Sequence, residues 1–427
     1  MIQTVRGTFD ILPDEVPRWR FLEEAARAVF RCYGYREIRT PIFERTELFA
    51  RSVGEETDIV AKEMYTFVDR SGESLSLRPE STASVVRAYI QHKMWTWGSV
   101  VKLFYIGPHF RYERPQKGRF RQFHQIGAEA IGQSDDPAID AELIEMIEEY
   151  LERVGVSERA LFINSVGCAQ CRPTYVQQLK TALAGAIARM CENCQRRYET
   201  NPLRILDCKV EADQPLIERA PALVDHLCDA CAAHFEAVRR HLEARGIVYQ
   251  ISPRLVRGLD YYTRTAFEIT GARLGAQNAI VGGGRYDGLS EILGGPPAKG
   301  IGFALGMERL LLALPEDVAV ADEAPDLYIA YLGDAARREA FRLARRLRRE
   351  GLVVLYDFEE RRLRRLMAQA DRVKASYVVL IGEEELAAGR YTLRDMQTGE
   401  QEALSEEALV RKLVTARVTR ASARRGS

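Results

Sequence analysis

The 427-residue sequence has no excess charge of either sign. Lys and Arg total 61 and Asp and Glu also total 61, so the formal net charge is zero. This balance excludes a uniformly basic protein of the kind that coats nucleic acid. Any RNA-binding surface must therefore be local. Residues 326–427 carry 21 basic and 16 acidic side chains, a local positive excess.

Long apolar segments are also missing. No stretch approaches the roughly 20 apolar residues that span a bilayer, and the opening MIQTVRGTFDILPDE lacks the apolar core of a signal peptide. We therefore expect a cytoplasmic protein that does not enter a membrane. Because single domains usually have about 100–200 residues, two or three folded units are expected.

Cysteine is scarce outside one segment: seven of the eight cysteines lie between Cys168 and Cys231. A disulfide framework is typical of short secreted chains, so thiols or a metal site are favoured here. Four thiolates drawn from the three CxxC pairs and Cys208 are able to hold a structural zinc ion. The first two CxxC pairs supply four candidate ligands: Cys168, Cys171, Cys191 and Cys194. Ordinary buried thiols are the alternative, because seven cysteines exceed the four that one zinc ion needs.

The first part of the chain mixes helical and strand-like patterns. Apolar spacing predicts a helix over 18–31, and residues 35–43 predict a strand in which Pro41, lacking an N–H, suits an edge or an interface. A helix is expected at 137–154. The remaining strand-like segments are 63–69, 74–78, 101–112 and 119–131, expected to form one antiparallel sheet, and then 247–251, 254–270 and the strand that enters a helix within 300–314.

Two further units stand out from this core. Residues 168–245 are mostly helical and interrupt strand-rich sequence, which predicts an inserted helical domain. From Asp326, apolar strands alternate with amphipathic helices, which predicts an α/β domain with a mainly parallel sheet. The expected fold class is α/β. An α+β core at 1–325, built on an antiparallel sheet flanked by helices, holds the insertion; an α/β domain spans 326–420, and 421–427 form a disordered basic tail.

The richest stretch is GPHFRYERPQKGRFRQFHQIGAE at 107–129, which places five basic residues within eleven positions. A solvated charged hairpin is the simplest reading of the charge alone. The flanking apolar residues Phe110, Phe120 and Phe123 argue against it, because they place the arginines on a partly buried sheet. Guanidinium groups suit phosphate and aromatic rings stack nucleobases, so a nucleotide site is favoured.

These residues resemble the class II aminoacyl-tRNA synthetases. The order FRYE, basic loop, RQFHQ resembles motif 2 of that family; GIGFALGMERLL, with Arg309, resembles motif 3, and GYREIRTPIF, with Pro41, resembles motif 1. Two more segments, LVRGLDYYTRTAFEI at 255–269 and GGGRYDGL at 282–289, resemble motifs of the histidyl-tRNA synthetase family. The resemblance implies a histidine–tRNA ligase. Such an enzyme forms histidyl-adenylate and pyrophosphate from L-histidine and ATP, and then loads tRNA(His) for protein biosynthesis.

The resemblance also implies residue roles for histidine binding. Within LRPESTA, Glu80 and Thr82 would contact the ammonium group, with Gln125 assisting; Ser81 stands where glycine is frequent in the family. An imidazole ring needs a partner for each nitrogen. The residues that resemble those partners are Glu129 and Tyr262, with Tyr261 packing nearby.

Adenylation spreads negative charge over the α-phosphate, which fixed cations must stabilise. By resemblance, the catalytic residues are Arg111, which bridges carboxylate and α-phosphate, and Arg257 on the opposite side. Arg119 and Arg309 would hold the γ-phosphate, and Phe123 would stack the adenine. Mg²⁺ is expected to accompany ATP.

The resemblance further implies a homodimer and RNA contacts. Motif 1, around Pro41, would form the subunit interface; the C-terminal domain would bind the anticodon. The motif 2 loop, at Arg114, Gln116 and Lys117, would approach the acceptor end. Two other functions are open: a histidine-sensing regulatory relative of the synthetases, and a pure RNA-binding protein. The first typically lacks the catalytic arginines and the anticodon-binding domain, and the second needs no nucleotide site.

Overall fold

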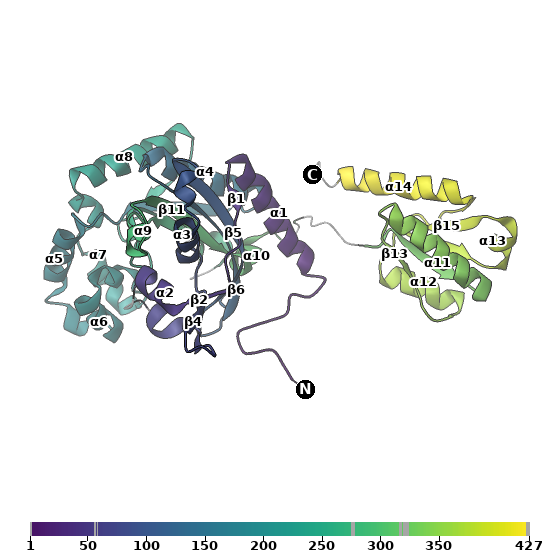
Figure 1. Cartoon of the computed structure of the whole chain (residues 1–427), viewed down its shortest axis with the longest axis horizontal. Helices are drawn as coiled ribbons and strands as arrows, with labels where there is room; N and C mark the ends of the chain where they lie inside the picture. Colours follow the sequence, from purple (N-terminus) through teal and green to yellow (C-terminus); the bar gives the residue numbers. More distant parts are fainter. Residues whose placement is uncertain are drawn as a thin grey trace. The chain divides into compact units, whose positions relative to one another are not determined.

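The computed structural model describes residues 2–54, 57, 59–274, 278–315, 318 and 324–423. The chain divides into two compact units, Met1–Val318 and Ala319–Ser427, and each is described by itself (Figure 1). Among the residues described, no helix combines the length and apolar character that crossing a bilayer requires.

The first unit is built on an eight-stranded mixed sheet in the order β1-β5-β6-β11-β10-β9-β7-β8. Its central strands are antiparallel, whereas β1 pairs parallel to β5 and β8 parallel to β7 at the two edges. The strands are β1 (Arg36–Glu37), β5 (Val100–Phe110), β6 (Gln122–Gly132), β7 (Arg159–Ser165), β8 (Gln250–Ile251), β9 (Thr263–Gly271), β10 (Ala279–Arg285) and β11 (Lys299–Gly306).

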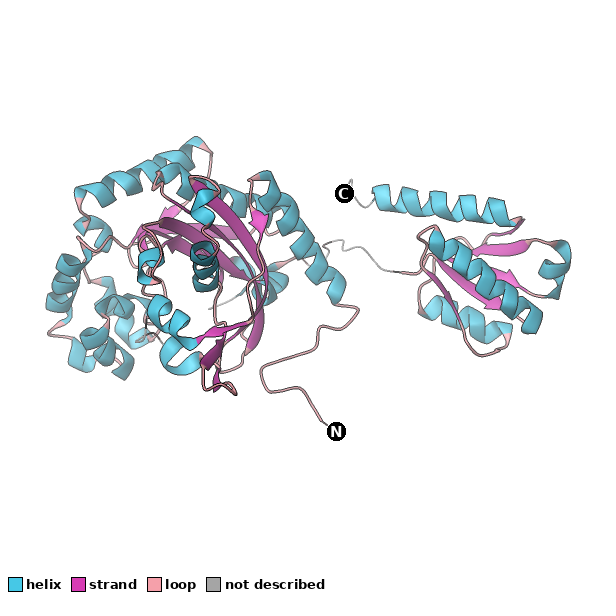
Figure 2. Ribbon diagram, in the orientation of Figure 1, coloured by secondary structure: helices cyan, strands magenta, loops and turns pink. Residues whose placement is uncertain are grey.

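Helices cover both faces of this sheet (Figure 2). One apolar core joins the sheet to α1 (Val16–Cys32), α4 (Pro137–Arg153), α8 (Asp229–Ala244) and α10 (Met307–Ala313). The second core contains α3 (Thr82–Gln91) and the insertion. Local signals set some of these boundaries: α4 begins at Pro137, and the carboxylate of Asp136 accepts the N–H of Ala138 at 2.9 Å, an N-cap.

A separate three-stranded antiparallel sheet corrects the expectation of one antiparallel sheet over 63–131. Its order is β2-β4-β3, with β2 (Phe43–Arg45), β3 (Thr66–Val68) and β4 (Ser74–Leu77), and it is accompanied by α2 (Thr46–Val53). The predicted strand over 35–43 is divided as well, because β1 belongs to the large sheet and β2 to the small one. Pro41, which has no N–H for a ladder, lies at this crossing.

The insertion is helical, as the sequence predicts. Its helices are α5 (Arg172–Leu183), α6 (Glu192–Thr200) and α7 (Gln214–Glu218), joined by short 3-10 turns that include Pro202–Asp207 and Leu223–His226. The last helix, α8, returns to the core, where Phe235, Val238 and Leu242 are buried. The short helix α9 (Leu289–Ile292) follows β10.

The second unit has a five-stranded sheet in the order β13-β12-β14-β15-β16, with parallel pairing at β13, β12 and β14. All five residues of β12 are buried because helices cover both faces. Its elements are β12 (Leu327–Tyr331), α11 (Asp334–Arg349), β13 (Val354–Tyr356), α12 (Leu363–Arg372), β14 (Tyr377–Ile381), α13 (Glu383–Ala388), β15 (Tyr391–Asp395), β16 (Gln401–Leu404) and α14 (Glu406–Ala423).

The sequence-based expectations of an α/β fold with a helical insertion and a C-terminal α/β domain are confirmed. The antiparallel hairpin β15–β16 and the helix α14 of the second unit were not predicted. Of the predicted tail at 421–427, residues 421–423 continue the backbone of α14. Residues 424–427 lie outside the described residues.

Candidate active site

A cavity of about 260 Å³ lies against β6, β10 and β11 in the first unit. Its walls come from the start of α3, the loop between β5 and β6, the segment before β9, and α10. Ten of the residues singled out from the sequence line it: Glu80, Thr82, Arg111, Arg119, Phe123, Gln125, Arg257, Tyr261, Tyr262 and Arg309. Ser81 and Glu129 are not in its lining, but both are buried directly behind it.

Two strand glycines make room for the charged groups of the site. A Cβ on Gly302 would lie 1.7 Å from Oε2 of Glu129, its cross-strand partner on β6. A Cβ on Gly282 would lie 1.8 Å from Nη2 of Arg257. The side chains of Glu129 and Arg257 therefore lie directly against the backbone of these two glycines. The glycine cluster of the segment GGGRYDGL is part of strand β10.

Glu129 is completely buried, and both of its carboxylate oxygens have partners. Thr82 donates its hydroxyl to Oε1 at 2.7 Å, and Tyr286 donates to Oε2 at 2.7 Å. Burial raises the pKa of Glu129 to about 8, although the two hydroxyls oppose the shift. The group is therefore poised to gain or lose a proton near neutral pH when the charge in the cavity changes.

Two acceptors suited to an ammonium group stand beside Glu129. The Glu80 carboxylate accepts the backbone N–H groups of Thr82 and Ala83, at 2.7 and 3.0 Å, at the start of α3. Burial raises the pKa of Glu80 as well. On β6, Oε1 of Gln125 is buried and makes no hydrogen bond within the described structure. Because an unpaired buried oxygen is costly, Gln125 is prepared to accept from a bound ligand.

Two guanidinium groups are held in fixed positions. Arg257, in the loop before β9, pairs its Nη1 with Oε2 of Glu268 at 2.8 Å. Its buried Nε makes no hydrogen bond to any residue that the structure describes. Arg111 donates Nε to the carbonyl of Pro79 at 2.9 Å and lies over the ring of Phe123, 5.3 Å from its centroid. Both cations are thus oriented before any ligand arrives.

Helix α10 anchors the basic loop between β5 and β6 and also the start of β6. Arg309 donates Nε to the carbonyl of Gly118 at 3.3 Å, and the carboxylate of Glu308 accepts the backbone N–H of His124 at 2.9 Å. Burial, reinforced by the neighbouring Arg119, lowers the pKa of Arg309. The loop's Arg119 pairs its Nε with Glu113 at 2.7 Å.

The side chain of Ser81 makes a hydrogen bond that a glycine at this position could not make. Its Oγ lies 2.7 Å from Nε2 of His109, whose Nδ1 lies 3.1 Å from the carbonyl of Gly107. Nδ1–H therefore donates to the carbonyl, and the Ser81 hydroxyl donates to Nε2. Burial keeps the pKa of His109 well below its ordinary value, so this ring is neutral. It stacks on Phe123, with centroids 5.8 Å apart.

Some residues of the site were not assigned from the sequence. Tyr286 lines the cavity, and its hydrogen bond to Glu129 depends on the strand register. Tyr105 and Glu113 also line the cavity and were not singled out. Arg285, next to Tyr286, does not line the cavity and forms a buried ion pair with Asp140 at 2.6 Å.

The cysteines of the insertion form two separate clusters. Cys168 and Cys171 meet Cys228 and Cys231, whereas Cys191 and Cys194 meet Cys208 and Asp213. The four candidate ligands of the first two CxxC pairs thus do not share one site. Sequence spacing identifies CxxC pairs but not which pairs meet, because that depends on how the insertion folds back on itself.

Comparisons with known proteins agree with the geometry. The family model described as histidyl-tRNA synthetase matches residues 7–310, and an anticodon-binding domain model matches 326–416. A histidine–tRNA ligase of Solibacter usitatus is 56% identical over 97% of this chain and 99% of its own length. One of Koribacter versatilis is 53% identical over 96% and 95%. The crystal structure of apo histidyl-tRNA synthetase from S. aureus superposes with a TM-score of 0.82 at 40% identity, covering 97% of this chain and 100% of that one.

Proposed function

The chain belongs to the histidyl-tRNA synthetase family, and from this membership we propose how its cavity acts as a histidine–tRNA ligase. A carboxylate oxygen of L-histidine attacks the α-phosphorus of ATP, and pyrophosphate leaves. A hydroxyl of the terminal ribose of tRNA(His) then attacks the carbonyl carbon of the adenylate, and AMP leaves. The products are histidyl-tRNA, AMP and pyrophosphate.

The histidine end of the cavity lies over Glu129. We assign the imidazole to Glu129 and Tyr262, with Tyr261 packing against it, because a carboxylate and a phenol can each fix one ring nitrogen. The ammonium group would be taken by Glu80, Thr82 and Gln125. In support, the buried Gln125 oxygen is unpaired and Glu80 is close to the same wall.

The ATP end carries the fixed cations. Arg111 and Arg257 are assigned to the carboxylate and α-phosphate, where the transition state gains charge. Arg119 and Arg309 are assigned to the γ-phosphate and Phe123 to the adenine. Mg²⁺ would enter with ATP as part of the substrate. The pairing of Arg257 with Glu268 supports this assignment, since it fixes the guanidinium while its buried Nε keeps no hydrogen bond among the described residues.

The second unit would bind the anticodon of tRNA(His), with Arg114, Gln116 and Lys117 of the motif 2 loop near the acceptor end. The family model at 326–416 supports this role, as does the local positive charge. We propose a cytoplasmic location because translation, which consumes charged tRNA, takes place there.

We also propose a homodimer formed through the segment around Pro41. The strand β2 that follows it is an edge strand of the small sheet. Large apolar side chains are exposed on both edge strands of this sheet and just before β2: Ile42, Phe43, Phe67 and Val68. Such a patch on one small sheet is typical of a subunit interface, and a second copy offers the same surface across a two-fold axis.

The observation that carries the proposal is the pairing of a buried carboxylate with fixed arginines across one cavity. ATP–pyrophosphate exchange, measured with each of the twenty amino acids, tests it. We expect exchange with histidine alone. Exchange with no amino acid, together with histidine binding, would favour the regulatory relative; binding of RNA without exchange would favour the RNA-binding protein.

Finally, we propose that the insertion binds structural metal through its cysteine clusters. This binding is separate from the chemistry of the cavity.

A further inference from the structure

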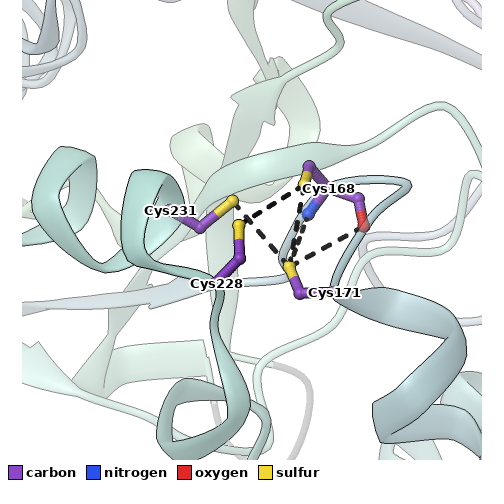
Figure 3. Close-up of side chains that lie close together, drawn as sticks. All are labelled: Cys168, Cys171, Cys228 and Cys231. Atoms are coloured by element: carbon purple, nitrogen blue, oxygen red, sulfur yellow. Dashed lines mark hydrogen bonds between the residues drawn. The ribbon is translucent and has the colours of Figure 1, made fainter.

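The first cysteine cluster joins the two ends of the insertion. Cys168 follows β7, Cys171 lies at the start of α5, and Cys228 and Cys231 lie at the start of α8, 60 residues further along the chain (Figure 3). Their four sulfurs lie within 4.8 Å of one another. The insertion is therefore closed at its base by these four side chains.

The sulfur separations fit a tetrahedral zinc ion. The pairs Cys168–Cys171, Cys168–Cys228 and Cys171–Cys231 each have Sγ atoms 3.8 Å apart. At the Zn–S bond length of about 2.3 Å, two sulfurs of a regular tetrahedron lie about 3.8 Å apart. A disulfide needs about 2.05 Å. The geometry matches four thiolates around one ion and matches no disulfide.

The surrounding backbone favours thiolates over thiols. The N–H of Cys168 donates to Sγ of Cys171 at 3.1 Å. Cys171 and Cys228 are the N-cap residues of α5 and α8, so two helix N-termini point toward the sulfurs. Gly167 has φ +66°, and a Cβ there would lie 2.7 Å from Sγ of Cys171. This glycine lets the chain turn tightly around the sulfur cluster.

We propose that Cys168, Cys171, Cys228 and Cys231 bind one structural Zn²⁺, and that this ion braces the segment carrying Tyr261 and Tyr262. Zinc fits because it is bound tetrahedrally by four cysteines in closed structural sites and has no redox chemistry. The ion would link the first and last helices of the insertion.

The brace acts through backbone contacts. Gly167, next to Cys168, accepts the N–H of Arg264 at 2.8 Å, and Val166 donates its N–H to the carbonyl of Arg264 at 2.7 Å. Arg172, next to Cys171, donates a guanidinium N–H to the carbonyl of Tyr262. The cysteine turn thus lies directly against the residues that wall the histidine end of the cavity.

The second cluster supports a second zinc ion independently. Sγ of Cys191 and Cys208 lie 3.8 Å apart, and Sγ of Cys208 lies 3.3 Å from Oδ2 of Asp213. Cys194 and Asp213 are buried, and the backbone N–H of Val210 donates to Sγ of Cys208 at 3.4 Å. Three thiolates and one carboxylate make a complete tetrahedral set. This site fastens the start of α6, and among the described residues no neighbour of its ligands hydrogen-bonds Tyr262. Asn201, which follows α6, instead donates to the side chain of Asp260 at 2.8 Å.

Metal analysis of the full-length chain, purified without a metal-binding tag, tests the assignment. We expect two zinc ions per chain by elemental mass spectrometry. Cys231→Ser should lose one, Cys208→Ser the other, and the double variant both. Cys32→Ser, an exposed cysteine on α1, should keep two. Zinc-free protein, iron in place of zinc, or zinc content that none of the cluster variants lowers would overturn the proposal.

If a variant does not fold, the wild-type chain still gives a readout. Titration with a thiol-specific mercurial should release two zinc ions to a colorimetric chelator. Protein reconstituted with Co²⁺ should show the intense visible bands of a tetrahedral thiolate site. Release of none, or weak octahedral bands, would contradict both sites.

The brace itself, which rests on the proposed function, is tested by kinetics. Cys231→Ser should raise the KM for histidine about tenfold in ATP–pyrophosphate exchange and change the KM for ATP much less. Cys208→Ser is the matched control and should leave the histidine KM near that of the wild type. Equal effects of both variants would refute the brace. Absence of histidine-dependent exchange in the zinc-loaded wild type would instead refute the proposed function.

Discussion

At the scale of single residues, Glu129 is proposed to bind histidine, but burying its carboxylate lowers the stability of the folded chain. Its carboxylate is buried, and its pKa of about 8 lies well above the ordinary value of a glutamate. Glu129→Gln should raise the KM for histidine on the order of 10²-fold, since an amide offers the imidazole a different donor pattern. The KM for ATP should barely change. Steady-state exchange kinetics measure both, and an unchanged histidine KM would place Glu129 outside the pocket.

The same variant should be more stable than the wild type at high pH. Below an ordinary glutamate pKa of about 4.3, Glu129 is protonated in both folded and unfolded chains. As pH rises from there to about 8, the unfolded chain ionises first, so the wild type loses stability. The glutamine variant does not, and between pH 5 and pH 9 it should gain several kcal/mol relative to the wild type, since a pKa raised from about 4.3 to about 8 corresponds to about 5 kcal/mol. Thermal unfolding at pH 5, 7 and 9 measures this gain, with the exposed Glu152→Gln as control. A gain that is the same at every pH would contradict the raised pKa.

Arg257 provides the second prediction at this scale. Arg257→Ala should slow adenylate formation on the order of 10²–10³-fold and leave histidine binding largely intact, because in the proposed mechanism the guanidinium stabilises charge that develops in the transition state. Single-turnover measurement of adenylate formation gives the rate, and equilibrium dialysis gives the binding. Near wild-type speed would remove Arg257 from the mechanism.

Gly282→Ala offers an independent route to the same position. The added methyl would occupy the space of the Arg257 guanidinium, 1.8 Å from Nη2, so the arginine must move. We expect a slow adenylation step in this variant even though every charged group is retained. If Gly282→Ala is fast while Arg257→Ala is slow, the position of the guanidinium matters less than its charge.

At the scale of elements, the exposed apolar surface of the small sheet gives a prediction about assembly. Ile42→Asp, just before β2, should dissociate the proposed dimer, because a buried unpaired carboxylate at an interface is strongly unfavourable. Activity should fall in parallel, because backbone hydrogen bonds connect Ile42 to the cavity. The N–H of Arg78, which follows β4, donates to the carbonyl of Ile42. The carbonyl of Arg78 in turn accepts the N–H of Phe110, which precedes Arg111. Sedimentation and exchange activity at micromolar concentration test this. Ile251→Asp, equally exposed on the far edge strand β8, is the control. A fully active monomer would refute the coupling.

Elements whose signals are local could be predicted from the sequence, and those that depend on distant partners could not. Asp136 and Pro137 predict the start of the helix at 137–154, and the helix begins at Pro137. The division of the strands between two sheets was missed because β3 and β4 pair with each other and with β2, a choice that periodicity does not encode. The cysteine pairs were visible, but their partners across 60 residues were not.

The site shows the same limit. Ten residues that the family motifs single out line one cavity, although the motifs were identified without the fold. The hydrogen bond from Tyr286 to Glu129 needs the register of β6, β11 and β10, which only the assembled sheet supplies.

At the scale of the whole molecule, the chain combines a catalytic unit with a unit whose own first and last elements are tied together. Asp326, just before β12, accepts hydrogen bonds from Arg417 and Arg420 of α14, at 2.9 and 2.8 Å. A cut before Asp326 therefore removes this unit as a whole. A chain ending at Pro325 should still form histidyl-adenylate, because every residue assigned to histidine and ATP lies before that point.

The same truncated chain should charge tRNA(His) poorly. Loss of the anticodon-binding unit should lower kcat/KM for tRNA on the order of 10²-fold, the result of losing a few kcal/mol of contacts. Adenylate formation, measured alongside, shows that the catalytic unit is folded. Raising the salt concentration should weaken tRNA binding more steeply in the full chain than in the truncated one, because phosphate contacts made by the basic C-terminal unit release counterions. Full charging efficiency by the truncated chain, or identical salt dependence of the two, would show that this unit does not contribute to RNA binding.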